Sequence, residues 1–195
     1  MSVLDTRGRI SPARAALWRS LGRWLFAHTP HTAHRLRRAI LRRFGADLRG
    51  NVKIRRSVKI DRPWNLSAGH LTIFGDHAAL RLREPIEIGE RCVISQYAVL
   101  ATEVLDPALS EPAGRLVDRV GPIRIEDDCW VAADALVLPG VTIRAGAVIG
   151  ARALVATDVP GWTVAVGEPA RGLKARAFVN APGGGAERAA AGEHG

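Results

Sequence analysis

The side chains able to carry acid–base or metal chemistry are few and unevenly distributed. Of the six histidines, none stands between His77 and His194. The two cysteines, Cys92 and Cys129, are isolated, and no CxxC pair or His/Cys cluster has the spacing of a zinc site. We therefore expect no metal, and we interpret the cysteines as reduced core residues of a cytoplasmic protein. A catalytic site would therefore have to be formed by elements of the fold that bring residues distant in the sequence together.

The stretch 123–160 is built on a period of six residues. Apolar residues stand six positions apart along this stretch, and a small or modest side chain follows each of them by four positions. A period of six fits neither a helix nor an isolated strand, and it is typical of a hexapeptide β-helix, whose stacked coils bury a continuous core. The rhythm begins at Val52, slips through Leu71 and Ile73, resumes to Leu100 and lapses until 123. The unbroken apolar series is Ile125, Val131, Val137, Ile143, Ile149 and Val155.

The N-terminal segment carries most of the positive charge. The chain has a net charge of +9, and residues 1–62 hold 16 of its 28 basic residues against three acidic ones. Ser11-Pro12 predicts a helix start, and two amphipathic, arginine-rich helices are expected over 12–44. The first should turn Ala15, Trp18, Leu21 or Gly22, and Leu25 to one side. The second should do so with Leu36, Ile40, Leu41 and Phe44.

Three interpretations of these helices are compatible with their composition. They could cover one end of the β-helix, where strand edges would otherwise be unpaired. They could also rest peripherally on an anionic membrane through residues 12–44. DNA binding has no recognition-helix motif to support it, so no nucleic-acid partner is expected. No secretory signal or membrane-spanning run is found.

Two segments interrupt or follow the repeats. Residues 101–122, which include Glu103 and Asp106, are rich in proline, glycine and charge and should form a loop that carries function. After Pro160 a last strand, a turn at Gly167-Glu168-Pro169 and a short basic tail are expected. The resulting division is a helical cap at 1–46, a β-helix at 47–165, a tail at 166–180 and a disordered end at 181–195.

Several motifs together resemble one family. They are LRRFGA at 41–46, IGERCVISQ at 88–96, CWVAADALVLPGVTI at 129–143, VIGARALV at 148–155 and VGEPAR at 166–171. The chain is similar to hexapeptide-repeat acyltransferases of the colanic-acid-biosynthesis type. The resemblance implies a left-handed parallel β-helix that works as a homotrimer, with acetyl-CoA and a saccharide acceptor in clefts between neighbouring copies. It implies an O-acetyltransferase of exopolysaccharide biosynthesis, and the basic helical segment would suit cytoplasmic work beside the inner membrane.

The resemblance also implies a set of coenzyme contacts. Main-chain groups at small corner residues would hold the pantetheine arm, and the basic tail would face the CoA phosphates. Small residues are also required at coil corners without any ligand, and a basic tail can be merely solvated. The cofactor-binding positions carried over are Ala132, Ala133, Gly150, Ala151, Ala156, Thr157, Arg171 and Lys174.

One departure affects the expected reaction. The family has a histidine as general base at the position of Leu105, before an aspartate that this chain keeps as Asp106. Leucine cannot accept a proton, and a lost general base costs about 10²–10⁴-fold in rate. Three explanations remain open: a binding or assembly protein without turnover, a carboxylate base at Glu103 or Asp106, or a histidine (His70 or His77) reaching from earlier coils.

Overall fold

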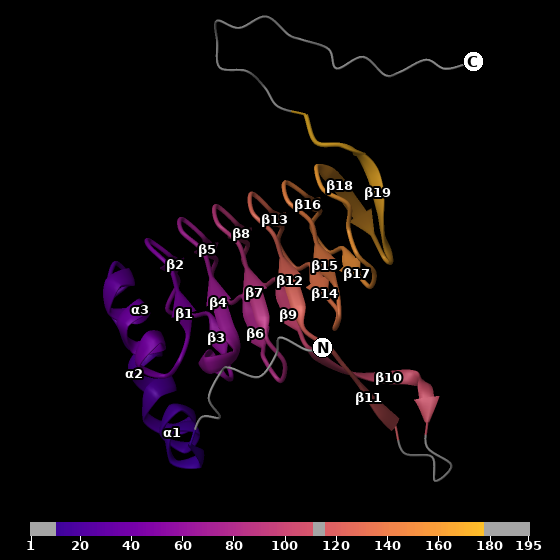
Figure 1. Ribbon diagram of the computed structural model, residues 1–195. Coiled ribbons are helices and arrows are strands. Elements are labelled where there is room, and N and C mark those ends of the chain that lie inside the picture. Colours follow the sequence, from indigo (N-terminus) through magenta and orange to yellow (C-terminus); the bar gives the residue numbers. More distant parts are fainter. Residues whose placement is uncertain (1–10, 111–115, 178–195) are drawn as a thin grey trace, which may run out of the picture.

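Three parallel sheets, here named A, B and C, wind into a solenoid of five coils. The computed structural model describes residues 11–110 and 116–177. Each coil contributes one short strand to each sheet, and the strands of successive coils stack in register (Figure 1). The mainly β, parallel β-helix expected from the six-residue period is therefore confirmed.

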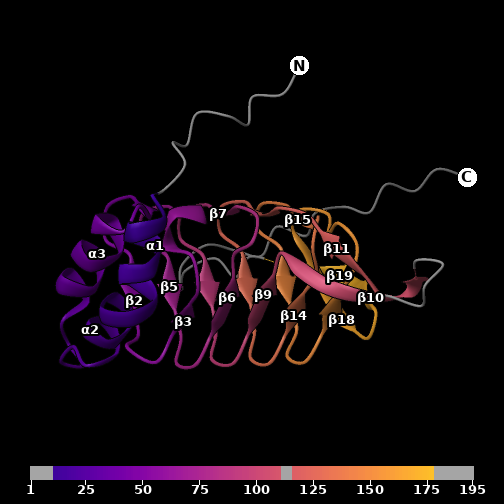
Figure 2. The same cartoon turned by 90° about the horizontal axis from the view of Figure 1, so that it is seen from below.

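The strands of the three sheets are short and follow one another in the order A, B, C. Sheet A contains β1 (Asp47–Leu48), β4 (Leu66–Ala68), β7 (Ile86–Ile88), β12 (Ile123–Ile125) and β15 (Thr142–Ile143). Sheet B contains the parallel strands β2 (Lys53–Ile54), β5 (Ile73–Phe74), β8 (Val93–Ile94), β13 (Trp130–Val131), β16 (Val148–Ile149) and β18 (Thr163–Gly167), and β19 (Ala170–Ala175) is added antiparallel to β18 at its end. Sheet C contains β3 (Lys59–Ile60), β6 (Ala79–Arg81), β9 (Val99–Ala101), β14 (Leu136–Val137) and β17 (Leu154–Val155), and Figure 2 shows β3, β6, β9 and β14 side by side.

The core is a stack of aliphatic layers inside the coils. All six residues of the regular series, from Ile125 to Val155, are at most 1% exposed. Burying them stabilises the solenoid by roughly 1.5–3 kcal/mol per side chain. The rhythm slips earlier because Ile60 and Ala68 are eight residues apart, and the passage from sheet C to sheet A therefore takes a longer turn. The core positions in that coil are Phe74 and Leu80, whereas Ile73 faces outward.

Two helical segments cover the N-terminal end of the solenoid. The first runs continuously through α1 (Pro12–Leu17), a π-helical turn (Trp18–Gly22) and α2 (Arg23–Ala27), and the second is α3 (His34–Arg43) (Figure 1). The Ser11 hydroxyl caps α1 by accepting from the Arg14 N–H. Within residues 11–110 and 116–177, no helix has the length and apolar composition that crossing a bilayer requires.

The buried side of the first segment differs from the expected one. Trp18, Gly22 and Phe26 are buried, whereas Leu21 and Leu25 are exposed. The π turn widens the helical period, so residues four apart stay on one side. Gly22 is required because a Cβ there would lie 2.6 Å from the Trp18 ring. Of the expected apolar side, Trp18 and Gly22, the alternative to Leu21, are buried, and the expectation was wrong at Leu25.

The second helix buries an arginine in place of a leucine. Arg37 is fully buried, and Leu36 is 50% exposed. The Arg37 guanidinium donates to the carbonyls of Ile54, Pro30 and His31, at 2.7, 2.7 and 2.8 Å. It also donates to the Thr29 hydroxyl at 2.8 Å. Arg37 thereby joins the end of α2, the connecting turn and β2.

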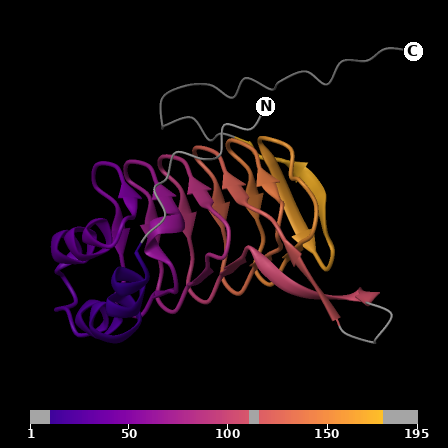
Figure 3. The same ribbon diagram turned by 60° about the horizontal axis from the view of Figure 1, so that its bottom comes forward.

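Two hairpins extend the solenoid. The segment expected to be a loop at 101–122 leaves the coil as an antiparallel hairpin of β10 (Glu103–Ser110) and β11 (Leu116–Val120), which projects from the body (Figure 3). The expected tail pairs β19 against β18, after a turn that contains a cis Glu168–Pro169 bond. The end expected to be disordered, 181–195, lies outside the described residues.

Candidate functional site

The corner between sheets B and C forms a straight row of turns, which we call the B–C edge. His77, Tyr97, Asp134 and Arg152 occupy the same position in four successive turns, each with φ between 58° and 60°. Such left-handed backbone is uncommon outside glycine and needs strong support from its surroundings. Here the support comes from hydrogen bonds between coils, such as Arg152 N–H to the Ala133 carbonyl at 2.9 Å. The B–C edge is therefore a rigid, regularly spaced surface.

Four of the expected CoA contacts lie together on this edge. Ala132 and Ala133 follow β13, and Gly150 and Ala151 occupy the same places one coil later. Within the described chain, the backbone N–H groups of Ala133 and Ala151 have no hydrogen-bond partner. Gly150 has a structural reason to lack a side chain, since a Cβ would lie 2.7 Å from Val166 Cγ1. The turns thus present small side chains and available N–H donors.

The other expected contacts are divided between two places. Arg171 of β19 pairs with Val166, which packs at Gly150, so Arg171 stands at the C-terminal end of the B–C edge. Lys174 lies further along β19, opposite Val164. Ala156 and Thr157 follow β17 at the corner between sheets C and A, the C–A edge. Sheet C separates them from the B–C edge, so one copy of the chain does not unite all eight residues.

The β10–β11 hairpin also starts from the C–A edge. The Thr102 N–H donates to the Arg81 carbonyl, and the Gly121 N–H donates to the Thr102 carbonyl, both at 3.0 Å. Leu105 is 59% exposed on β10, and Asp106 follows it with its backbone opposite Val117. The position at which a histidine would be expected is therefore accessible and apolar.

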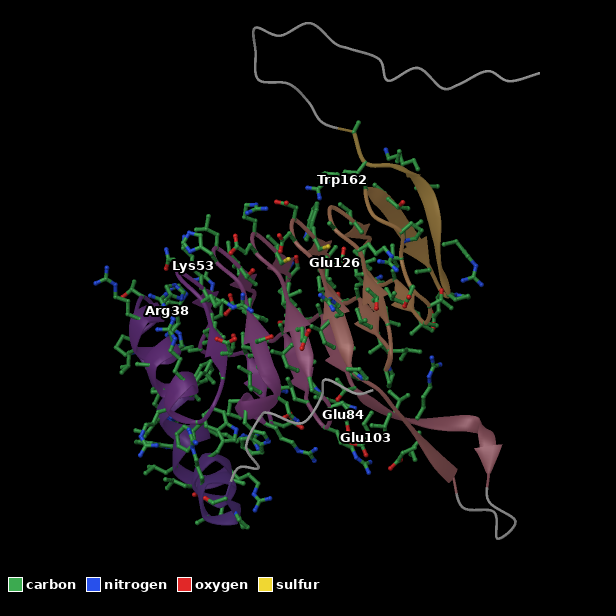
Figure 4. The ribbon with its side chains drawn as sticks, viewed as in Figure 1. Arg38, Lys53, Glu84, Glu103, Glu126 and Trp162 are labelled. Atoms are coloured by element: carbon green, nitrogen blue, oxygen red, sulfur yellow. The ribbon has the colours of Figure 1, made fainter. Side chains whose placement is uncertain are left out.

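Glu103 is engaged in an ion pair at the base of the hairpin. Its carboxylate accepts from the Arg83 guanidinium, which also donates to Asp118 Oδ2 at 2.9 Å. The hydrogen bond to Asp118 is the largest cause that raises the pKa of Arg83, and the hydrogen bond to Glu103 is the next. Figure 4 places Glu103 at the junction of hairpin and coil, near Glu84. The geometry assigns Glu103 to bracing the hairpin.

His77 and Tyr97 form an aromatic pair towards the N-terminal end of the B–C edge. Their rings stack with centroids 5.1 Å apart and planes within 9°. The Ser57 hydroxyl holds the turn, because it accepts from the His77 N–H at 3.1 Å and donates to Asp76 Oδ1 at 2.7 Å. The ring nitrogens of His77 have no hydrogen-bond partner among the described residues. No role was expected for Tyr97, although it stands one coil after His77 at the same turn position.

The second candidate histidine lies elsewhere. His70 stands at the corner between sheets A and B, and its Nδ1 accepts from the Asn51 N–H at 3.1 Å. Of the two histidines left open by the sequence, only His77 shares an edge with the candidate CoA contacts.

Metal-binding and cysteine chemistry have little support in the described residues. In the ranges 11–110 and 116–177, no group of three or more His, Cys, Asp or Glu side chains could hold a metal ion. Cys92 and Cys129 are free and buried on adjacent coils. The hydrogen bond to Cys129, followed by burial, raises the pKa of the Cys92 thiol. Cys92 is therefore a core thiol, as expected.

Sequence comparison identifies relatives that align with most of this chain. No protein-family model matches the chain. It is 39% identical over 163 residues to the colanic acid biosynthesis acetyltransferase WcaF of Escherichia coli K12, which covers 84% of this chain and 87% of that protein. The same values hold for the WcaF protein of Shigella flexneri.

Solved structures share the fold at low sequence identity. A maltose O-acetyltransferase from Clostridium difficile 630 superimposes with a TM-score of 0.75 and 23% identity, over 86% of this chain and 90% of that one. A hexapeptide-repeat acetyltransferase from Vibrio cholerae, solved with acetyl-CoA, gives a TM-score of 0.73 at 23% identity, over 85% and 87% of the two chains. At this identity the likeness concerns the fold alone.

Proposed function

Because this chain belongs to the family of colanic acid biosynthesis acetyltransferases, we propose that it transfers an acetyl group from acetyl-CoA to a sugar hydroxyl in exopolysaccharide biosynthesis, in the cytoplasm. The observation that carries the proposal is the B–C edge. Small turns with available N–H groups at Ala133 and Ala151 lead from Arg171 to the His77–Tyr97 pair. This row offers a fixed surface to an elongated ligand with phosphates at one end.

The CoA would lie along the B–C edge. Its phosphates would be held by Arg171, with Lys174 nearby, through charge-assisted hydrogen bonds. Ala132, Ala133, Gly150 and Ala151 would contact the pantetheine arm by their main chain. Four strand spacings separate β18 from β5, the strand before His77, which is about 19 Å. That span is comparable to an extended pantetheine arm and would bring the thioester towards His77.

The complete site would require more than one copy. The C–A edge carries Ala156, Thr157 and the β10–β11 hairpin, and sheet C separates it from the B–C edge. We propose a homotrimer in which the C–A edge of one copy meets the B–C edge of the next. The saccharide acceptor would then lie in the cleft, between the hairpin of one copy and the His77–Tyr97 pair of another.

We assign the role of general base to His77. A ring nitrogen of His77 would take the proton from the acceptor hydroxyl while the hydroxyl oxygen attacks the thioester carbon. Backbone N–H groups would stabilise the resulting oxyanion. Collapse of this intermediate breaks the carbon–sulfur bond, and the departing thiolate takes the proton back from the histidine. Glu103 is less suited to this role because Arg83 occupies its carboxylate.

The assignment is tested by measuring free CoA released from acetyl-CoA in the presence of a saccharide panel. We expect the native protein to release CoA with an acceptor, and His77→Gln to lower kcat by about 10²–10⁴-fold. Leu173→Gln, at an exposed position on β19, serves as the control. If Glu103→Gln or Asp106→Asn causes that loss while His77→Gln does not, the base is a carboxylate.

A binding or assembly protein is the second candidate function, favoured by the exposed Leu105 at the position of the family's histidine. In that case the native protein would bind CoA, measured by calorimetry, without releasing any from acetyl-CoA. Release restored by Leu105→His would then establish that the native chain has lost turnover and kept the ligand site.

A further inference from the structure

The helical cap presents a row of large apolar side chains to solvent. Leu17, Leu21, Trp24 and Leu25 are 47%, 48%, 57% and 41% exposed, and we call them the cap stripe. Steps of four, three and one residue place them on one side of the continuous helical segment 12–27. A contiguous exposed apolar surface of this kind marks an interaction site more often than chance exposure does.

The cap stripe is separate from the packing that attaches the helix. Trp18, Gly22 and Phe26, on the other side, form the contact with the solenoid, and Trp18 Nε1 donates to the Ile60 carbonyl at 3.2 Å. The buried contact with the solenoid is therefore made by residues outside the stripe, and the stripe side chains stay 41–57% exposed.

The charge around the stripe has a single sign. Residues 11–46 contain eight arginines and no aspartate or glutamate. Arg19 and Arg23 are exposed on the same segment as the stripe, and Arg35 and Arg43 are exposed on α3. In the part of the chain that the structure describes, none of these four has an acidic partner. The cap thus combines apolar side chains with positive charge that the protein does not neutralise.

We propose that the cap binds the surface of an anionic phospholipid bilayer. The stripe enters the boundary between headgroups and acyl chains, with Trp24 at the interface, and the flanking guanidinium groups contact lipid phosphates. Complementary charge favours lipid over a cap-to-cap contact between two copies, because both caps carry the same charge. Peripheral binding needs no membrane-spanning helix.

Lipid binding would orient the proposed active site. A cavity of about 680 Å³ lies between the cap and the B–C edge, and its lining includes Ala27, His31 and His77. A cap resting on a bilayer therefore keeps the N-terminal end of this edge close to the lipid surface. This orientation rests on the proposed function, whereas the lipid binding itself does not.

Vesicle flotation of the full chain tests the proposal without any activity measurement. We expect the protein to float with vesicles of phosphatidylcholine plus phosphatidylglycerol, to stay unbound with phosphatidylcholine alone, and to be released by high salt. The double variant Leu21→Gln/Trp24→Gln should lower the bound fraction by about tenfold or more. Arg19→Gln/Arg23→Gln should weaken binding at low salt. Leu173→Gln and Arg119→Gln, both exposed and remote from the cap, are the matched controls.

Three results would overturn the proposal. The first is no binding of the native protein to the anionic vesicles. The second is an equal loss in the cap and control variants while melting curves show every variant to be folded. The third is a change of mass in lipid-free solution when Leu21 and Trp24 are replaced, since that result would make the stripe a contact between copies.

Discussion

His34 lies half-buried in α3, where its surroundings oppose a positive charge. Burial is the main effect that lowers the pKa of His34, and the charges of Arg37, Arg55 and Lys53 act in the same direction. A hydrogen bond to the Ile54 carbonyl, with Nδ1 at 3.0 Å, partly opposes them. The folded chain therefore binds fewer protons at this site than the unfolded chain in mildly acidic solution.

Stability should consequently fall as the solution is acidified. The contribution of neutral His34 is fully present above its unfolded pKa of about 6.5, and it is lost as the pH drops from there through the lower pKa of the folded state. We expect the free energy of unfolding, measured by urea titration, to decrease from pH 7.5 to pH 5.5, and His34→Gln to show a shallower decrease. Arg35→Gln, at the exposed neighbouring position, should keep the native slope. Identical slopes for the native chain and His34→Gln would contradict the argument.

The positions of some site residues could be predicted from the sequence, whereas the contacts of others could not. Ala133 and Ala151 could be placed by the six-residue period, because turn positions repeat with the coils. The ion pair between Glu103 and Arg83 could not be predicted in this way, because Arg83 stands twenty residues earlier and meets Glu103 only through the stacking of coils. The stacking of His77 on Tyr97 likewise depends on the register of two coils.

At the scale of elements, one arginine holds the cap together. The buried Arg37 joins α3 to the end of α2 and to the Ile54 carbonyl of β2. Desolvation is the main cause that lowers its pKa, yet four neutral oxygens accept from its guanidinium. No acidic side chain takes part in these bonds.

Removing this side chain should destabilise the cap strongly. Arg37→Ala leaves several buried acceptors unsatisfied and opens a void, and we expect a loss of about 3 kcal/mol in the free energy of unfolding. Arg35→Ala, exposed in the same helix, should change it by less than about 0.5 kcal/mol. Urea denaturation at equal protein concentration measures both. Equal losses would mean that the hydrogen bonds of Arg37 contribute little.

The elements differ in how far the sequence determined them. The repeats were predictable because each apolar residue from Ile125 to Val155 reports the same coil geometry. The cap was predictable as helical, but its buried side was not: a π turn and Gly22 select Phe26 over Leu25. The hairpin was predictable as an excursion from the coil. Its strand pairing has no periodic signature within 101–122.

At the scale of the whole molecule, the three outer faces of the solenoid differ in polarity. The outward residues of sheet A in successive coils are polar: Asp47, Ser67, Glu87, Arg124 and Thr142. Sheets B and C turn mainly apolar residues outward: Ile73, Val93, Trp130, Val148 and Val164 on B, and Ala79, Val99, Leu136 and Leu154 on C. Because sheet C lies between the two edges that would meet, the proposed contacts between copies would cover its apolar face.

Solution mass tests this arrangement together with the site it creates. Light scattering should give the native protein three times the 21.0 kDa mass of one chain. Leu136→Glu places a charge on the apolar face of sheet C and should lower the mass to that of one chain. Arg124→Glu, on sheet A of the same coil, should leave the mass unchanged. Because the B–C edge and the hairpin of one site would come from different copies, Leu136→Glu should also weaken CoA binding by about tenfold or more. A native protein with the mass of one chain would remove the basis for the composite site.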